Sequence, residues 1–221
     1  MSLLHPPYTL WHLSYVLLGI ALSPALFVDR SISVLVAFFL GLGIGAHSLD
    51  ETMGNPLKTR LSKKTLYLIG FGALAMSIVI GIYYVLFLSL ALLPFILIES
   101  FFAVAYNLEI FHGAFHSTFF FALSWGSIPF LTGYFVNSLS LTPSALIMAF
   151  GVAMLTVAQK SLSEYARFFR RKVPEVNALR LTSGGHLPTS SLELIHPAER
   201  ALKALTITIF LFSIALLIAL H

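Results

Sequence analysis

Residues 65–108 read TLYLIGFGALAMSIVIGIYYVLFLSLALLPFILIESFFAVAYNL, and this apolar run decides the fold class. Its 44 residues contain a single charged side chain, that of Glu99. A helix needs about 20 apolar residues to cross the hydrocarbon core of a bilayer. The run is therefore long enough for two membrane-spanning helices, and we expect a tight turn between them near residues 81–86.

The composition of the whole chain agrees with this reading. Its 221 residues are 58% hydrophobic and only 10% charged, whereas soluble domains carry roughly 25% charged residues. Disorder is excluded because disordered chains are poor in aromatic residues, and this chain has 20 Phe. The absence of Cys excludes a disulfide framework, a thiolate metal site and a cysteine nucleophile. The sequence predicts an integral membrane protein.

Apolar runs outside the central one complete an all-α, polytopic membrane bundle of about seven transmembrane helices. We treat residues 1–221 as a single domain, with a polar cytoplasmic loop at 161–200 whose first part, 161–172, continues the sixth helix. The expected spans are residues 8–28, 31–48, 65–82, 86–108, 114–136, 142–158 and 201–220.

The basic residues predict the orientation of the chain. Of the 13 Lys and Arg, all but Arg30 lie either at positions 58–64 or between Lys160 and Lys203. Loops rich in Lys and Arg stay in the cytoplasm, so we expect a cytoplasmic N-terminus and a C-terminus on the opposite side. The basic residues are explained by topology and contact with the lipid bilayer, including anionic lipids, rather than by nucleic acid. The sequence names no protein partner.

A first polar cluster ends the second span. His47, Asp50 and Glu51 have the spacing of one helix face, which suits a divalent cation or an acid–base pair. The alternative is a polar helix end in which Asp50 or Glu51 pairs with Lys58 or Arg60.

A second cluster lies between the fourth and fifth spans. Glu109, His112 and His116 share one face if the helix is unbroken, and Glu-x-x-His is the spacing found in carboxylate-bridged di-metal bundles. Gly113 is a point where the helix can break, and anchoring at the membrane interface is the alternative role.

Glu99 lies deep in the central apolar run. It shares a helix face with Tyr106, and an ionisable group at this depth should face the bundle interior, paired or protonated. The expected partners are His12, His47 or a bound cation, and the alternative is a structural hydrogen bond to a neighbouring helix. The predicted topology puts the first two clusters at the same membrane face, where they would rim a cavity open to a long apolar substrate with a polar head.

An ordered series of short motifs resembles the UbiA superfamily of intramembrane prenyltransferases. The N-terminal stretch is similar to the family's opening helix, Asp50 and the residues after it to the first aspartate-rich motif, and Tyr106 to the tyrosine of the fourth-to-fifth helix segment. The last motif resembles the family's fifth helix. The matching stretches are LHPPYTL at 4–10 with LGIAL at 18–22, Asp50 with NPL at 55–57 and RLS at 60–62, Tyr106, and WGSIP at 125–129 with Gly133 and Tyr134.

The resemblance implies a divergent, shortened member that transfers a prenyl group from a prenyl diphosphate held through Mg²⁺. It implies catalytic roles for Asp50 and Tyr106, and substrate-binding roles for Lys58, Arg60, Trp125 and Arg167. Glu51, which is an addition relative to the family motif, and Glu99, an ionisable group deep in the apolar run, are further candidate catalytic residues. The chain departs from the family pattern in both acidic motifs. The first keeps only Asp50, with Ala46 and Gly54 at the other two positions, and the second, expected near residues 159–171, contains Gln159, Lys160, Glu164 and Arg167 but no Asp.

Three functions therefore stay open. A divergent prenyltransferase ranks first, acting on a prenyl diphosphate or a related isoprenoid lipid. The second is a lipid-modifying enzyme with Fe or Zn, because imidazole with carboxylate suits these metals better than Mg²⁺. Its expected ligands are His47, Asp50, Glu51, Glu109, His112 and His116. The third is a non-catalytic lipid-binding or assembly protein.

Overall fold

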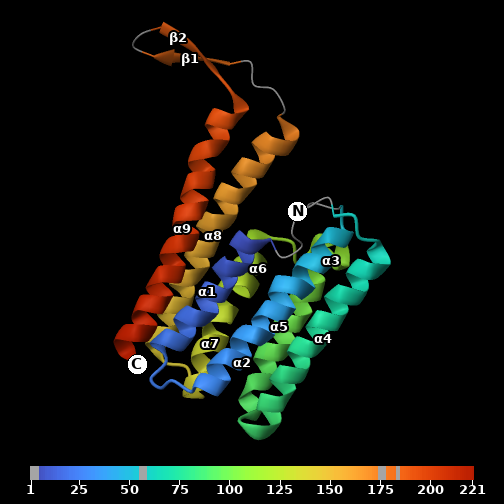
Figure 1. Cartoon of the computed structure of the whole chain (residues 1–221), viewed down its shortest axis with the longest axis vertical. Coiled ribbons are helices and arrows are strands. Elements are labelled where there is room, and N and C mark those ends of the chain that lie inside the picture. Colours follow the sequence, from blue (N-terminus) through green and yellow to red (C-terminus); the bar gives the residue numbers. More distant parts are fainter. Residues whose placement is uncertain (1–4, 55–58, 174–177, 183–184) are drawn as a thin grey trace.

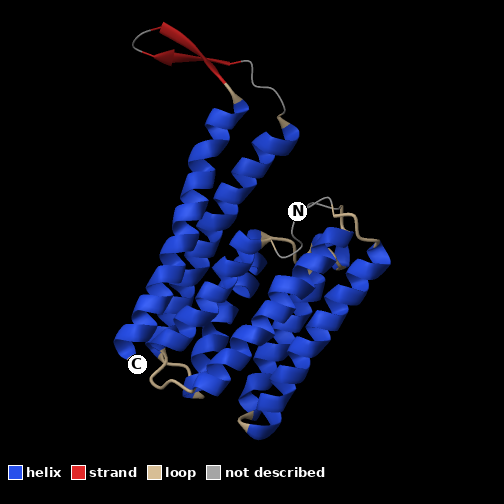
Figure 2. Ribbon diagram, in the orientation of Figure 1, coloured by secondary structure: helices blue, strands red, loops and turns tan. Residues whose placement is uncertain are grey.

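The computed structural model describes residues 5–54, 59–173, 178–182 and 185–221, most of them in helices packed as one bundle (Figures 1 and 2). The expected all-α bundle is confirmed. In chain order the elements are α1 (Pro6–Leu22), α2 (Val28–Phe38), η1 (Phe39–Ala46), α3 (His47–Thr52), α4 (Lys63–Phe87), η2 (Leu90–Leu92), α5 (Leu93–Ala105), η3 (Phe111–Gly113), α6 (Thr118–Ala122), η4 (Leu123–Ser127), α7 (Ile128–Ser138), α8 (Pro143–Lys172), β1 (Ala178–Thr182), β2 (Gly185–Thr189) and α9 (Ser191–Leu220).

Helical segments run back and forth through the bundle (Figure 1). Two of them are composite, because α2, η1 and α3 follow one another without a break, as do α6, η4 and α7. The inner parts of both, η1 and η4, are π-helices. A π-helix inside an α-helix is rare and is found mostly at functional sites, so these two segments direct attention to whatever lies beside them.

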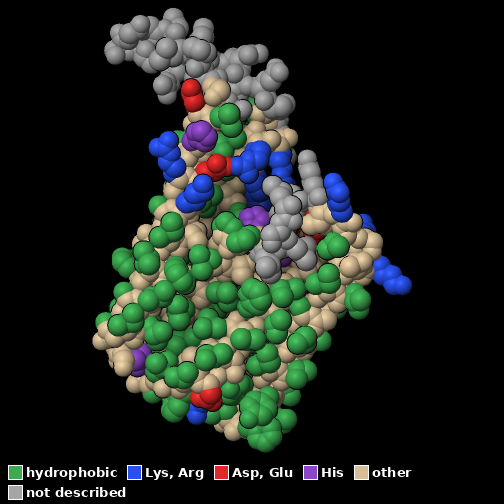
Figure 3. All heavy atoms as spheres, in the orientation of Figure 1, with side chains coloured by type: hydrophobic (Ala, Val, Ile, Leu, Met, Phe, Trp, Pro, Cys, Tyr) green, Lys and Arg blue, Asp and Glu red, His purple; other side chains and the backbone are tan. Residues whose placement is uncertain are grey.

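The outer surface is that of an integral membrane protein. Within the described residues, five helices are long and apolar enough to cross a membrane: Val28–Thr52, Lys63–Phe87, Thr118–Ser138, Pro143–Arg171 and Leu192–Leu220. α1, with 17 residues, and Leu90–Ala105 are shorter, so the count of seven spans stays a prediction. Figure 3 shows hydrophobic side chains covering one end of the bundle, with most Lys and Arg side chains gathered toward the other.

The turn expected near residues 81–86 is wrong. α4 continues to Phe87, and the chain reverses at Leu88 and Ser89, where the Ser89 side chain accepts the N–H of Ala91. Gly81 serves packing instead of a turn, since a Cβ there would lie 2.7 Å from the Cδ1 of Ile96. The glycine lets α4 and α5 approach closely, which is a common use of small residues between membrane helices.

Other helix ends also differ from the expected spans. α1 ends at Leu22, before Ser23 and Pro24, and α9 begins at Ser191, where Ser190 caps it by accepting the N–H of Glu193. The continuation of the sixth helix over 161–172 is present in α8. An antiparallel hairpin that was not predicted joins α8 and α9, and its register pairs Ala178 with Thr189 and Thr182 with Gly185.

The centre of the bundle is the contact between α1 and α7. A Cβ on Gly19 would lie 2.0 Å from the carbonyl oxygen of Phe130, and one on Gly133 would lie 2.2 Å from that of Val16. The two backbones therefore touch, and large side chains fill the space beside them, including Trp11 and Tyr15 of α1. This packing fixes the position of α1 against α7, and α1 carries Tyr8 and His12 to the polar end of the bundle.

Candidate functional site

A polar cavity is lined by residues of α1, η1, α3, the connection between α5 and α6, α6, η4 and α8. We call it the α8 cavity, and its volume is about 160 Å³. Its lining residues come from five parts of the chain. They are His5, Tyr8 and His12; Leu42, Ala46, His47 and Asp50; Tyr106, Asn107 and His116; Phe121 and Trp125; and Gln159, Lys160, Ser163, Glu164, Arg167 and Arg171.

Six of the residues predicted from the sequence line this cavity. They are His47, Asp50, Tyr106, His116, Trp125 and Arg167. Three of the six belong to the motifs behind the family resemblance, and they come from α3, from the α5–α6 connection and from η4. The fold therefore brings together, at one place, residues that are as far apart in the sequence as positions 50 and 167.

α8 supplies a stripe of polar side chains that the sequence analysis did not assign as a group. Lys160, Ser163, Glu164, Arg167 and Arg171 all line the cavity. Their spacing of three or four residues is that of one face of a helix, and this periodicity was the available signal. Comparison with an aspartate-rich motif does not reveal this stripe, because none of its residues is an Asp.

The two π-helices position two imidazoles. The Nδ1 of His12 lies 2.7 Å from the carbonyl oxygen of Trp125 in η4, and the Nδ1 of His47 lies 3.0 Å from that of Gly43 in η1. A carbonyl oxygen only accepts hydrogen bonds, so each Nδ1 carries the proton and each neutral ring keeps a lone pair on Nε2. Both rings line the cavity, and the Nε2 of each can accept a proton.

The charge around the cavity is predominantly positive. Lys160 forms an ion pair with Glu164, and its ammonium lies 5.8 Å from the centre of the Phe121 ring. Arg167 and Arg171 add two further cations to the lining, and Asp50 adds a second carboxylate. Burial lowers the pKa of His5, and the nearby charges of Arg167 and Arg171 lower it further. An anionic ligand would find this environment favourable.

Aromatic rings form another wall of the cavity. The rings of Tyr106 and His116 are stacked with centroids 4.4 Å apart, and Phe121 and Trp125 lie 5.6 and 6.0 Å from the Tyr106 ring. Several buried polar atoms of lining residues have no hydrogen-bond partner within the described structure: Nδ1 of His5, Nε1 of Trp125 and Oε1 of Gln159. The site is thus polar enough to gain from a ligand or water that would satisfy them.

The second cluster predicted from the sequence does not form. Residues 106–116 are not one helix, because Glu109, Phe111 and His112 have φ angles of 48°, 56° and 56°, and Gly113 has 76°. Glu109 and His112 are exposed and do not line the α8 cavity. The carboxylate of Glu109 lies 3.9 Å from Nδ1 of His116. The prediction of a shared helix face was wrong because the chain turns at the positions around Gly113.

The first cluster forms only in part. His47 and Asp50 reach the cavity from α3, whereas Glu51 turns away from it, is 2% exposed and accepts the backbone N–H of Thr59 at 2.8 Å. Among the residues that the structure describes, no three His, Asp or Glu side chains are grouped as a metal site. The expected six-residue His and carboxylate metal centre is therefore wrong as a set.

The remaining predicted residues lie elsewhere. Glu99 lines a different cavity, and its carboxyl oxygens are buried without a hydrogen-bond partner among the described residues. Its expected pairing with His12 or His47 is wrong, because neither of its carboxyl oxygens has a hydrogen-bond partner among the described residues. Arg60 is exposed and does not line the α8 cavity. Lys58, the motif residues at 55–57 and Leu4 lie outside the described residues.

The fold matches solved structures of a UbiA homologue from Archaeoglobus fulgidus. The structure of that protein bound to Cd²⁺ superposes with a TM-score of 0.59 at 14% identity, over 98% of this chain and 85% of that one. Another structure of a UbiA homologue from this organism gives a TM-score of 0.55 at 16% identity, over 99% and 82% of the two chains. No protein-family model and no curated protein matches the sequence. The likeness confirms the expected resemblance at the level of the fold.

Proposed function

Given a UbiA fold with the α8 cavity at one end, we propose that this chain is a divergent prenyl-transfer enzyme acting on a prenyl diphosphate. The observation that carries the proposal is the polar stripe of α8, which faces two imidazoles and an aromatic wall across a single cavity. A diphosphate head group needs cations, and an isoprenoid chain needs the apolar surroundings of the bundle. The cavity offers both within one site.

The cations of α8 account for binding of the head group. Lys160, Arg167 and Arg171 line the cavity, and bonds from guanidinium and ammonium groups to phosphate oxygens are among the strongest in proteins. The same cations stabilise the charge that develops on the diphosphate as it leaves. We place this end of the bundle in the cytoplasm, because Lys and Arg gather there.

The aromatic wall accounts for protection of the reacting chain. The C–O bond breaks with its electron pair leaving on the diphosphate, and positive charge develops on the allylic carbon. The ring faces of Tyr106 and Trp125 attract a cation, and the apolar helices around them exclude the water that would otherwise capture it. Trp125 is only 5% exposed, so this part of the cavity is shielded from solvent.

The proton of the acceptor needs a base. A nucleophilic oxygen, nitrogen or carbon of the acceptor forms the new bond to the allylic carbon and releases a proton. We assign its uptake to the Nε2 of His12, whose Nδ1 is held by the carbonyl of Trp125 at 2.7 Å. The ring also lies 5.4 Å from that of Trp125, so the base adjoins the aromatic wall.

A divalent cation fits this site only if the diphosphate helps to hold it. Mg²⁺ is usually bound by one or two carboxylates with waters and substrate phosphates, and the α8 cavity offers Asp50 and Glu164. Bound there, the metal would neutralise part of the charge on the leaving diphosphate. The Cd²⁺ in the Archaeoglobus fulgidus homologue supports a divalent metal in proteins of this fold. The imidazole and carboxylate set required for Fe or Zn does not come together, so we do not propose that chemistry.

The test is binding and turnover of farnesyl diphosphate by the purified chain with Mg²⁺. We expect saturable binding, slow release of diphosphate, and about thirtyfold weaker binding in Arg167→Ala, since one charge-assisted bond is worth about 1.5–3 kcal/mol. Arg170→Ala is the matched control, because Arg170 lies on the same helix but pairs with Glu199 of α9. Equal effects of the two variants would contradict the proposal, and binding without any diphosphate release would favour a non-catalytic lipid-binding protein.

A further inference from the structure

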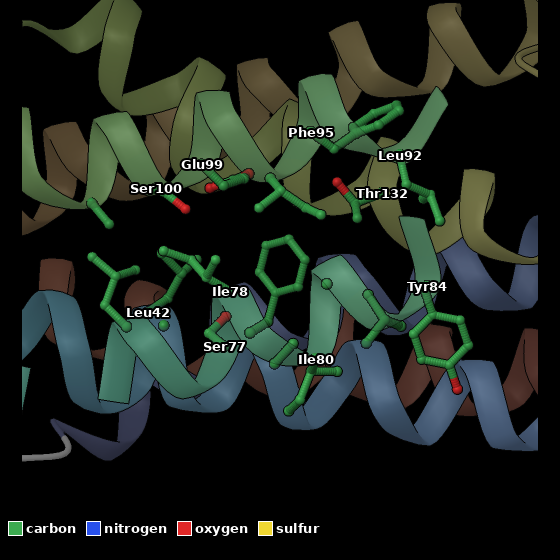
Figure 4. Close-up of a pocket in the computed structure, with 18 of the residues that line it drawn as sticks. Leu42, Ser77, Ile78, Ile80, Tyr84, Leu92, Phe95, Glu99, Ser100 and Thr132 are labelled. Atoms are coloured by element: carbon green, nitrogen blue, oxygen red, sulfur yellow. The ribbon is translucent and has the colours of Figure 1, made fainter. Parts of the chain in front are cut away.

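A second cavity lies between α4 and α5, and residues of α2, η1 and α7 also line it. We call it the Glu99 cavity, and its volume is about 90 Å³. One water needs roughly 10–15 Å³ of such space, so a group several times that size fits. Figure 4 shows Glu99 and Ser100 on one side of the cavity and Ser77 on the facing helix. Most other lining side chains are aliphatic or aromatic.

The carboxyl group of Glu99 makes no hydrogen bond that would account for its burial within the described part of the protein. Both of its oxygens are buried and make no hydrogen bond to any described residue. None of the residues lining the cavity is a Lys, Arg or His. A charged carboxylate without a cation is very costly in apolar surroundings, so the group is held as a neutral acid with one O–H donor and one carbonyl acceptor.

Two other polar groups of the cavity, those of Thr132 and Tyr84, are already engaged within the chain. The hydroxyl of Thr132 donates to the carbonyl of Ile128 at 2.8 Å, and that of Tyr84 donates to Ser33 at 3.0 Å. Glu99 thus differs from Thr132 and Tyr84 in offering the cavity a donor and an acceptor that are both without a hydrogen bond in the described structure. A plain hydrocarbon chain would leave that pair unsatisfied, so a lipid tail alone does not account for it.

The position of the cavity favours a ligand that comes from the bilayer. The helices that form it present apolar side chains outward, among them Tyr83 of α4 and Leu97 of α5, which are 55% and 60% exposed. The absence of basic lining residues disfavours a phosphate or carboxylate head group. The α8 cavity has the opposite character, and the two share only Leu42 among their lining residues.

From this geometry we propose that the Glu99 cavity binds an apolar molecule from the bilayer that carries one neutral oxygen, as a hydroxyl or a carbonyl. The carboxylic acid of Glu99 donates its proton to that oxygen and, when the ligand is an alcohol, also accepts the hydroxyl hydrogen. The apolar side chains enclose the adjoining carbon atoms. The site is separate from the proposed prenyl-transfer site, and the inference does not rest on it.

The experiment uses the full chain in lipid nanodiscs with photoreactive dodecyl probes that end in a hydroxyl, a ketone or a methyl group. Peptide mapping locates the labelled helices. We expect the hydroxyl or ketone probe to label α4 and α5 about fivefold more than the methyl probe, as one net hydrogen bond predicts. If only the hydroxyl probe shows the excess, the ligand is an alcohol, and if both do, any neutral oxygen suffices. Equal labelling by all three probes would overturn the proposal.

Variants at Glu99 separate binding from structure. Glu99→Leu should remove the excess labelling, Glu99→Gln should keep most of it because an amide also donates and accepts, and Glu109→Leu should keep all of it because Glu109 is exposed outside the cavity. Excess labelling that survives in Glu99→Leu would show that the carboxyl does not hold the ligand. A large drop in the unfolding temperature of Glu99→Leu would assign Glu99 a structural partner and would also overturn the proposal.

Discussion

The two cavities of this bundle use ionisable residues in opposite ways. In the α8 cavity, cations, carboxylates and imidazoles face one another, and each imidazole of the central pair is tied to a backbone carbonyl. In the Glu99 cavity, a single carboxyl faces apolar side chains and hydroxyls. An ionisable residue in a membrane protein can therefore indicate different kinds of binding site. What faces it decides whether it suits an anion, a proton or a neutral oxygen.

The largest effect should come from removing two cations of α8. We expect the double variant Lys160→Met and Arg167→Met to bind farnesyl diphosphate roughly 1,000-fold more weakly, because two charge-assisted bonds are lost. The control is the double variant Arg170→Met and Lys203→Met, which removes the same charge from α8 and α9 outside the cavity. Isothermal titration measures both. A comparable loss in the control would mean that overall charge, and not the cavity, attracts the ligand.

Removing the assigned base should affect rate rather than binding. In His12→Gln, we expect turnover to fall roughly 100-fold, a typical contribution of general base catalysis, while the affinity for farnesyl diphosphate changes little. The glutamine amide can still donate to the carbonyl of Trp125, so the local packing is preserved. His196→Gln, at an exposed position on α9, should leave turnover intact. A fall in affinity that matches the fall in rate would assign His12 to substrate binding instead.

The aromatic wall should contribute a smaller part of the rate. Tyr106→Leu removes the ring that stacks on His116 at 4.4 Å, and loss of one cation–π contact of about 1–2 kcal/mol predicts roughly tenfold slower turnover. Tyr83→Leu is the matched control, because Tyr83 faces outward from α4. Single-turnover measurements at saturating substrate separate the two. Unchanged turnover in Tyr106→Leu would show that the aromatic wall does not contribute to the reaction rate.

The smallest effect should distinguish two buried glutamates. Glu51→Leu should lower the free energy of unfolding by about 1–3 kcal/mol, because it leaves the N–H of Thr59 without the carboxylate that now lies 2.8 Å away. Glu99→Leu should leave stability unchanged or slightly higher, since it removes a carboxyl with no hydrogen bond in the described structure. Thermal unfolding in one detergent compares the pair. The comparison fails if both variants are destabilised equally.

Much of the fold could be predicted from the sequence, because long apolar runs admit few alternatives in a bilayer. The location of the turn between α4 and α5 could not be predicted. A glycine such as Gly81 is compatible both with a turn and with close packing of a neighbouring side chain, here that of Ile96, and the sequence does not distinguish the two. The hairpin between α8 and α9 is hard to predict because its strands have only five residues each, and the alternation of Leu179 and Leu181 with Arg180 and Thr182 is too short to stand out in a polar stretch. Helix number is set by hydrophobicity, whereas helix ends are set by caps and packing.

The site was predicted less completely for a different reason. Motif matches predict Asp50, Tyr106 and Trp125, and the expected place of the second acidic motif points to Arg167; all four line one cavity. Glu109 and His112 were misplaced because helical spacing was applied across positions where the chain adopts positive φ angles. Residue spacing predicts a shared helix face only where the helix is unbroken. α8 is unbroken from Pro143 to Lys172, so the spacing of its polar residues correctly predicts that they share a face.

The most direct test of the central claim is to map where a photoreactive farnesyl diphosphate analogue labels the full chain in nanodiscs. The contrast between the cavities predicts labelling of α8 and of the segment from Tyr106 to Trp125, with competition by inorganic diphosphate. Labelling concentrated on α4 and α5, or labelling that diphosphate does not displace, would contradict it, because the charged head group would then have no role in choosing between the two sites.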